Sequence, residues 1–373
     1  MKACIFLILL VFVFTFDLFS YEMQQVSITF IDEDRDNRPV STEIFFPVNG
    51  EEDFSDNSSF PFIVFGHGWI SPYSLYQDLW EALVPQGWIM AFPTTEGGLF
   101  PNHQNFALDL AFLSFELSAA NNDPGSPLFG MVDSLSVVMG HSMGGGCSIL
   151  AAAGQHNFSS VVTLAAAAST NPPAIDAAAG VYLPSLTFAG TSDSITPPAS
   201  NQLPLYNNLA SVYKGYVSMN GVGHLGIYSN VQVFTLISKW LDFILHGESY
   251  HLNGFEDLLI AYQNEELLTY MIENNYTSLS DEQGLEPEPL FIRNYPNPFN
   301  PETTFLFLLN EPSEVVLTIF NSKGQKIAVL ADGLFLPGRH RITWHPEAKS
   351  SGIYLYRMQA GNSVSTGRAL LLK

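Results

Sequence analysis

Short apolar runs alternate with longer segments of helical spacing between residues 60 and 247. Segments 74–87, 105–122 and 231–247 are typical of helices. Strands that alternate with helices predict an α/β fold with a mostly parallel central sheet. Ligands of such sheets bind beyond the carboxyl ends of the strands, so site residues are expected there. The strand-like runs are FIVF at 62–65, WIMAFP at 88–93, SLSVVMG at 134–140, VVTLAAA at 161–167, SLTFAG at 185–190 and YKGYVSM at 213–219.

The segment VVMGHSMGGGCSILAAA, from Val137 to Ala153, places Ser142 at the junction of a predicted strand and a predicted helix. Its centre, from Gly140 to Gly144, fits the G-x-S-x-G pattern, in which a sharp turn holds a strained serine above the edge of the sheet. The alternative is a glycine-rich turn that only connects two elements. The strand before the serine, the helix after it and the further glycines at 145 and 146 favour a nucleophilic serine.

A serine hydroxyl is a weak nucleophile at neutral pH, so it needs a base and a group that orients the base. In folds of this kind the chain order is serine, acid, histidine. Asp176 and Asp193 are the acidic residues between Ser142 and His224. Asp193 is preferred because it follows the strand at 185–190, whereas Asp176 lies in an alanine-rich stretch.

His224 is the predicted base, because it follows the acid and lies in the glycine-rich loop NGVGHLGIY. A purely structural histidine is the alternative. The other histidines fit less well, since they precede the acid, end a helix, or lie in the linker or the C-terminal region: His103, His156, His246, His251, His340 and His345.

Backbone N–H groups that stabilise a developing oxyanion are the next requirement of this chemistry. Met143, directly after the serine, supplies one donor in this fold, and the turn after the third strand supplies the other. That turn is GHGW at 66–69, so the Trp69 N–H is the predicted second donor. Gly68, Trp69 and His141 are expected to contact the substrate.

No cofactor and no metal are expected. The histidines and acids lack metal-ligand spacing, and no glycine pattern for phosphates or dinucleotides occurs in the right context. The residues predict acyl transfer to water without a cofactor. The formal net charge is -22, so the chain repels phosphate backbones and nucleic acid is a poor partner. A monomer is expected.

The chain begins with MKACIFLILLVFVFTFDLFS, in which one lysine precedes an apolar run from Ala3 to Phe16. A run of this length predicts a cleaved export signal over residues 1–20, and the alternative is an uncleaved anchor. Cys4 would leave with the signal. Cys147 then remains as the single cysteine, so no intramolecular disulfide is expected.

Three further regions are predicted along the chain. Residues 21–248 form the α/β domain, which opens with two strands around a polar turn. Residues 249–289 contain no lysine or arginine and are assigned to an acidic helix and linker. Residues 290–373 alternate like short strands, with hairpin turns at SKGQ and QAGN, and predict a small all-β Ig-like sandwich.

Residues 26–247 resemble the α/β-hydrolase superfamily, in the branch of dienelactone-hydrolase-like, chlorophyllase-like and bacterial cutinase or polyester (PET) hydrolase proteins. The matching blocks are DRDNRPVSTEIFFP, SPLFGMVDSLSVVMGHSMGGG, LTFAGTSDSITPPASNQLPLYNNL and a G-x-G-H loop. The resemblance implies a three-layer sandwich around a mostly parallel sheet. It also implies Ser142, Asp193 and His224 as a catalytic triad, with Trp69 and Met143 as oxyanion donors.

Two departures from the polyester hydrolases concern the substrate. Those enzymes carry a stacking tryptophan after the strand that follows the serine, where this chain has LAAAASTNPP. They also usually carry a disulfide near the end of the catalytic domain, for which this chain has no cysteines. Trp69 stands where a tyrosine or phenylalanine is usual and would keep a hydrophobic wall. The absent stacking tryptophan and the absent disulfide bear on polymer hydrolysis and leave the ester chemistry intact.

The tail, residues 291–373, resembles the type A sorting domain of the type IX secretion system found in Bacteroidota. The matching segments are NYPNPFNPETTFLFLL, VVLTIFNSKGQKIAVL, SSGIYLYRM and RALLLK. The resemblance implies the secretion machinery as a partner. It also implies passage through the outer membrane, followed by release or attachment at the cell surface.

The function expected from these features is a secreted serine carboxylic-ester hydrolase that acts on hydrophobic esters or polyesters, with PET among the candidate substrates. One alternative is a lipase-like or chlorophyllase-like esterase on smaller lipidic esters. The other is an inactive hydrolase-fold protein that binds at the cell surface, because a fold alone does not establish an activity.

Overall fold

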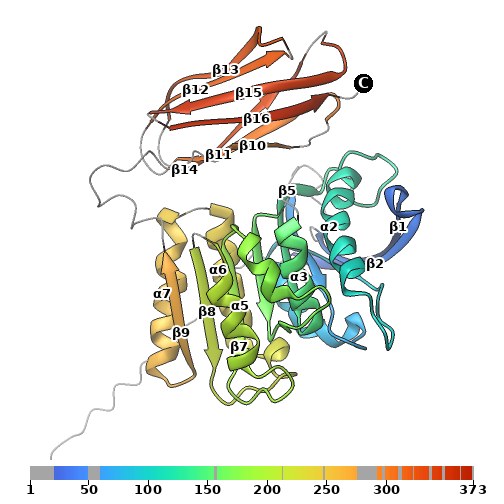
Figure 1. Ribbon diagram of the computed structural model, residues 1–373, viewed down its shortest axis with the longest axis vertical. Coiled ribbons are helices and arrows are strands. Elements are labelled where there is room, and N and C mark those ends of the chain that lie inside the picture. Colours follow the sequence, from blue (N-terminus) through green and yellow to red (C-terminus); the bar gives the residue numbers. More distant parts are fainter. Residues whose placement is uncertain are drawn as a thin grey trace, which may run out of the picture.

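The computed structural model describes residues 21–371 apart from 49–58, 155–157, 212, 247, 275–291, 296–298, 310–312, 322, 336–337, 347–348 and 362. The predicted export signal at 1–20 and residues 275–289 of the predicted acidic helix and linker lie outside the described residues. The described chain forms an α/β part and a C-terminal part made of strands (Figure 1).

The α/β part is built on a 9-stranded sheet with the order β1-β2-β4-β3-β5-β6-β7-β8-β9. The central strands from β4 to β8 pair in parallel, whereas β1, β2 and β9 pair antiparallel at the two edges. The prediction of a mostly parallel central sheet is confirmed. The strands are β1 Glu22–Asp32, β2 Arg38–Val48, β3 Phe60–Gly66, β4 Ile89–Pro93, β5 Val132–His141, β6 Ser160–Leu164, β7 Ser185–Gly190, β8 Tyr213–Met219 and β9 Leu268–Asn274.

Helices cover both faces of this sheet, which gives three layers (Figure 1). One apolar core lies under α1, α6 and α7, and a second lies under α2, α3, α4 and α5. The central strands β3, β6 and β7 are buried along their whole length, as expected for strands covered on both faces. The helices are α1 Gln77–Leu83, α2 His103–Ala120, α3 Met143–Gly154, α4 Ala174–Ala177, α5 Gln202–Asn208, α6 Val231–His246 and α7 Glu248–Asn264.

The α/β part extends further along the chain than the sequence predicts. The predicted boundary at residue 248 falls at the start of α7, whose Phe255 and Leu259 belong to the core. The segment assigned to the linker also contains β9, which pairs antiparallel with β8 along its whole length. The segment LTYMIEN alternates over too few residues to be assigned as a strand by itself. Its partner strand lies about 50 residues earlier, so the local pattern did not predict β9.

The C-terminal part consists of two antiparallel sheets with the orders β10-β11-β14 and β13-β12-β15-β16. The two sheets share one apolar core, to which both contribute, for example through Phe305 and Leu317. The predicted hairpin turns are confirmed, because β12 pairs with β13 across SKGQ and β15 pairs with β16 across QAGN. The strands are β10 Ile292–Tyr295, β11 Thr303–Leu309, β12 Ser313–Asn321, β13 Lys326–Phe335, β14 Gly338–Trp344, β15 Gly352–Ala360 and β16 Ser363–Leu371.

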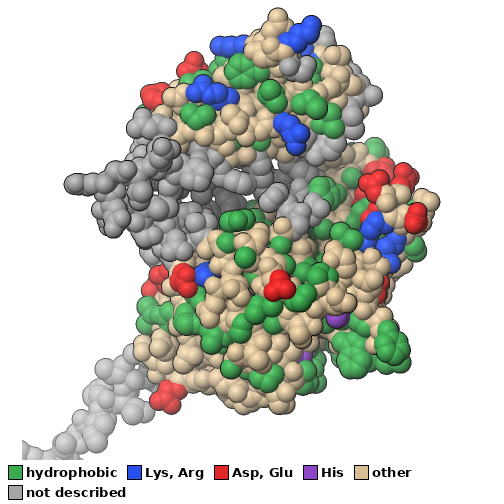
Figure 2. Space-filling model, viewed as in Figure 1, with side chains coloured by type: hydrophobic (Ala, Val, Ile, Leu, Met, Phe, Trp, Pro, Cys, Tyr) green, Lys and Arg blue, Asp and Glu red, His purple; other side chains and the backbone are tan. Residues whose placement is uncertain are grey.

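Charged side chains are sparse on the face shown in Figure 2, where lysines and arginines spread over the C-terminal part. Acidic side chains on this face gather around the turn that joins β1 to β2, whose residues 32–36 include four acids and one arginine. None of the described helices combines the length and the apolar character that a membrane span requires.

Candidate active site

Ser142 occupies the turn between β5 and α3 and has a backbone φ of 56°. A positive φ is uncommon for a residue with a side chain, and such strain persists where the surroundings enforce it. Two hydrogen bonds do so here, because Ser142 N–H donates to the Leu164 carbonyl and Ala167 N–H donates to the Ser142 carbonyl, each at 2.9 Å. Because α3 begins at Met143, Ser142 lies at the amino end of that helix, where the helix dipole favours negative charge.

The glycines around Ser142 allow three backbone segments to approach one another closely. A Cβ on Gly144 would overlap the carbonyl group of Gly66 in the turn after β3, and a Cβ on Gly140 would overlap the carbonyl of Gly144. A Cβ on Gly146 would meet the Ala167 carbonyl. The G-x-S-x-G pattern thus has a steric reason, since larger residues at these positions would push the turn away from β3 and β6.

His224 and Asp193 approach Ser142 from the loops after β8 and β7. The Nε2 atom of His224 lies 2.9 Å from Ser142 Oγ, and its Nδ1 atom lies 2.8 Å from Asp193 Oδ2. A carboxylate only accepts hydrogen bonds, so Nδ1 carries the proton and Nε2 is free to accept the serine proton. Residues that are distant in the sequence meet here because the carboxyl ends of parallel strands share one edge of the sheet.

The carboxyl group of Asp193 is buried, and burial alone would raise its pKa. Hydrogen bonds from His224 and from Thr196 outweigh burial, so the pKa of Asp193 lies below its usual value. Asp193 is therefore ionised at neutral pH and orients the imidazole of His224. The alternative acid, Asp176, is an exposed residue of α4.

Thr196 belongs to the same cluster and was missed by the sequence analysis. Its N–H and the N–H of Ile195 each donate to Asp193 Oδ1 at 2.9 Å. Its hydroxyl lies 2.9 Å from Asp193 Oδ2 and 3.1 Å from His224 Nδ1. The spacing from an aspartate to a threonine three residues later is a recognisable turn signal, in which the carboxylate accepts from the following N–H groups.

The turn after β3 contains the predicted oxyanion donor. Among the described residues, no backbone acceptor is found for the N–H groups of Trp69 and Met143. The Gly68 N–H instead donates to the Tyr76 hydroxyl at 2.8 Å. The side chain of Trp69 is 56% exposed, whereas that of Met143 is buried. Met143 follows Ser142 in its own turn, and the turn after β3 that contains Trp69 packs on Gly144 through Gly66 and His67.

His141 does not occupy the position expected of a substrate contact. Its ring is 1% exposed, and both of its nitrogens face protein atoms. Nδ1 lies 3.1 Å from the Tyr76 hydroxyl, and Nε2 lies 3.1 Å from the His224 carbonyl oxygen. Burial, and secondarily the nearby His224, lower the pKa of His141 to about 3. The expectation that the His141 side chain binds substrate is therefore corrected.

Gly68 N–H, the Tyr76 hydroxyl, the His141 ring and the His224 carbonyl form a hydrogen-bonded series. The two groups at its ends fix where the protons lie. The His224 carbonyl only accepts, so Nε2 of the neutral His141 carries the ring proton and Nδ1 accepts. The Tyr76 hydroxyl accepts from Gly68 N–H and donates to His141 Nδ1. Tyr76 and His141 thereby join the turn that contains Trp69 to the loop that contains His224. Tyr76 lies 65 residues from His141, and no local pattern announces the contact.

No group of three or more His, Cys, Asp or Glu side chains in the described part of the chain is arranged to hold a metal ion. Cys147 is buried in α3, its thiol faces the His103 carbonyl, and burial raises its pKa. The thiol therefore stays protonated and takes no part in the arrangement around Ser142.

One comparison with known proteins bears on this site. A family model described as PETase, PET hydrolase-like, matches residues 42–251. The matched region begins within β2 and ends within α7, so it includes the turns and loops that carry Trp69, Ser142, Asp193 and His224.

Proposed function

This chain belongs to the PET hydrolase-like family, and from that premise we propose that it is a serine carboxylic-ester hydrolase whose nucleophile is Ser142. One observation carries the proposal. Ser142 Oγ, His224 and Asp193 form a continuous hydrogen-bonded chain, with distances of 2.9 Å and 2.8 Å. This is the arrangement that lets a neutral imidazole take the proton of a hydroxyl while a carboxylate stabilises the imidazolium that forms.

In the proposed reaction, His224 Nε2 accepts the Ser142 proton as Oγ attacks the ester carbonyl carbon. The carbonyl oxygen becomes an oxyanion, which accepts hydrogen bonds from the N–H groups of Trp69 and Met143. Met143 is the first residue of α3, so the dipole of that helix also favours the negative charge. The intermediate collapses, the C–O bond of the ester breaks, and His224 gives its proton to the departing alkoxide. Water then attacks the acyl-enzyme, with His224 again as the base, and releases the acid and Ser142.

Uncharged, hydrophobic esters are the proposed substrates. Large apolar side chains are exposed directly beside the proposed catalytic groups: Trp69 at 56%, Ile195 at 64% and Leu225 at 58%. Such side chains favour alkyl or aryl groups, because contact removes apolar surface from water. The net charge of -22 works against strongly anionic acyl groups.

We further propose that residues 290–373 direct export through the type IX system and that the enzyme acts outside the cell. The support is the sequence resemblance of this region, together with its β-sheet architecture and separate apolar core. A region with its own core can be recognised as a unit, independently of the α/β part.

Hydrolysis of p-nitrophenyl butyrate tests the proposed chemistry. Wild type should release nitrophenol, and Ser142→Ala should lower kcat/KM by about 10³-fold or more, because the nucleophile is removed. Ser27→Ala is the matched control, since Ser27 is exposed on β1 and its hydroxyl hydrogen-bonds to Glu43. Equal rates for wild type and Ser142→Ala would contradict an enzyme that works through this serine and would favour a binding protein.

A further inference from the structure

Residues 164–168, which end β6 and continue through four alanines, are hydrogen-bonded both to Ser142 and to the region that follows Asp193. The N–H and the carbonyl of Ser142 each bond to the backbone of this segment at 2.9 Å. From the other region, the side chains of Thr196 and Gln202 bond to carbonyls of the same segment. A shift of the 164–168 segment would therefore act on the serine and on the loop of the acid together.

Gln202, the first residue of α5, is fully buried although its side chain is polar. Its Nε2 atom lies 2.6 Å from the Ala166 carbonyl oxygen and 3.2 Å from the Thr196 hydroxyl oxygen. An amide nitrogen has two protons and only donates, so each contact uses one of them. For its Oε1 atom no partner is found among the described residues. The nitrogen end of the Gln202 amide therefore makes the contacts that this side chain contributes to the site.

The hydroxyl oxygen of Thr196 lies within hydrogen-bond distance of four groups. Asp193 Oδ2 and the Ala165 carbonyl oxygen, both at 2.9 Å, only accept. His224 Nδ1 at 3.1 Å and Gln202 Nε2 at 3.2 Å donate. A hydroxyl has one proton and two lone pairs, so the two donors occupy the lone pairs and the proton goes to one of the two acceptors. Gln202 thus helps to fix the direction in which the Thr196 hydroxyl meets His224.

We infer that Thr196 and Gln202 are positioning residues that keep His224 aligned with Ser142 while the proton is transferred. The inference rests on the proposed function, because it concerns the proton transfer of that reaction. The Thr196 hydroxyl gives His224 Nδ1 a second acceptor beside the carboxylate, so the ring is held at two points. Gln202 ties this hydroxyl to the 164–168 segment, which also holds the turn of Ser142. Small misplacements of reacting groups lower the rate steeply, so a fixed geometry of base and nucleophile raises kcat.

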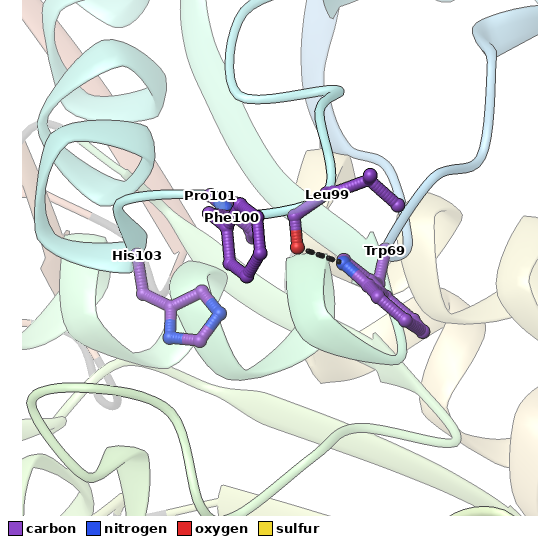
Figure 3. Close-up of a pocket in the computed structure, with 5 residues that line it drawn as sticks. All are labelled: Trp69, Leu99, Phe100, Pro101 and His103. Atoms are coloured by element: carbon purple, nitrogen blue, oxygen red, sulfur yellow. Dashed lines mark hydrogen bonds between the residues drawn. The ribbon is translucent and has the colours of Figure 1, made fainter.

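The two positioning residues are separate from the exposed surface that is proposed to contact the ester. Trp69 belongs to that surface, and it lines an open pocket together with Leu99, Phe100, Pro101 and His103 (Figure 3). Thr196 and Gln202 are buried and do not belong to this lining. Loss of either side chain should therefore lower kcat and leave KM nearly unchanged.

Steady-state kinetics on p-nitrophenyl butyrate tests the inference with three single variants. Thr196→Val removes the hydroxyl and keeps the N–H that bonds to Asp193, and Gln202→Met removes both amide protons. Each should lower kcat about tenfold and leave KM within about twofold. Thr196→Ser keeps a hydroxyl and should retain most of kcat. A raised KM with normal kcat, or an equal loss in Thr196→Ser and Thr196→Val, would overturn the inference.

The double variant Thr196→Val/Gln202→Met tests whether the two residues act as one unit. If Gln202 acts on His224 through the Thr196 hydroxyl, the double variant should be no slower than the slower single variant, because the same link is already broken. Losses that multiply to about a hundredfold would overturn a joint role. Should Thr196→Val fail to fold, as shown by thermal unfolding, Gln202→Met decides, since it leaves Thr196 in place.

Thr163→Val is the matched control. Thr163 lies in β6, is 1% exposed, and its hydroxyl has no hydrogen-bond partner among the described residues. The substitution is the same change of a buried threonine, in the strand that leads into the 164–168 segment. It should leave kcat and KM unchanged. A loss in Thr163→Val equal to that in Thr196→Val would show a general packing effect and overturn the inference.

The proton NMR signal of the His224 Nδ1–H separates failure of the inference from failure of the proposed function, because it is recorded without turnover. The signal is assigned by its loss in His224→Ala. It should change position in Thr196→Val and in Gln202→Met, and keep the wild-type position in Thr163→Val. If wild type cleaves no ester, the proposed function fails, and this signal alone decides whether Thr196 and Gln202 hold His224. An unchanged signal in Thr196→Val would overturn the inference in either case.

Discussion

Tyr76 and His141 illustrate, at the residue scale, how two loops are kept in register around one serine. Tyr76 accepts from Gly68 in the turn that carries Trp69, and His141 donates to the carbonyl of His224. A shift of either loop would therefore be transmitted to the other through buried, fully hydrogen-bonded groups. Tyr76 is a positioning residue in this account, because it acts on the reacting atoms through other groups.

Removing the Tyr76 hydroxyl should slow the reaction without weakening substrate binding. Tyr76→Phe leaves Gly68 N–H and His141 Nδ1 without their partner, so kcat should fall about tenfold while KM changes little. Steady-state kinetics on p-nitrophenyl butyrate measures both constants. Tyr228→Phe is the control, because the Tyr228 ring packs on His141 with centroids 4.8 Å apart, and it should leave kcat unchanged. A raised KM with normal kcat would contradict a positioning role.

His141 should make the stability of the fold depend on pH. Its pKa is about 3 in the folded protein against an ordinary value of 6.5. Between these values the unfolded chain binds a proton that the folded chain does not, so stability falls as the pH falls. The loss from this residue is about 2 kcal/mol between pH 7 and pH 5. Urea unfolding of wild type and His141→Gln should show a shallower pH dependence for the variant, and parallel curves would contradict the assignment.

At the scale of elements, the packing of α3 against the turn after β3 depends on glycine. Gly144→Ala would drive a Cβ into the Gly66 carbonyl, and backbone cannot move aside as a flexible side chain can. The variant should lose about 1–3 kcal/mol of stability and most of its esterase activity. Gly98→Ala is the control for stability, since nothing lies within 4 Å of a Cβ there. Unchanged melting temperatures in both variants would contradict this close packing.

The elements also show what the sequence could predict. Hydrophobic periodicity and turn residues predicted the strands that precede Ser142, Asp193 and His224. Each of these strands is a short apolar run that ends at glycine or polar residues. Contacts between residues that are distant in the sequence could not be predicted from local patterns. The antiparallel pairing of β9 with β8 and the bond from Tyr76 to His141 have no local signature. The inward orientation of His141 follows from packing against Tyr76, His224 and Tyr228.

The whole molecule combines an acidic α/β part with a β-sheet C-terminal part. If the C-terminal part is a sorting domain, a chain that ends at residue 289 should accumulate in the periplasm of a bacterium with type IX secretion. The full chain should reach the cell surface or the medium. Esterase activity per molecule should be the same in both, because the residues of the candidate active site all precede residue 248. An identical distribution of the two chains between fractions would contradict a role in export.

The most direct test of the central claim is covalent labelling of Ser142. Wild-type protein treated with an alkyl fluorophosphonate should gain one phosphonyl group, which peptide mass spectrometry should locate on Ser142, and esterase activity should fall in proportion. His224→Ala should react far more slowly, because the base that activates the hydroxyl is missing. Stoichiometric labelling of another residue, or equal labelling rates in wild type and His224→Ala, would contradict a nucleophile activated by this triad.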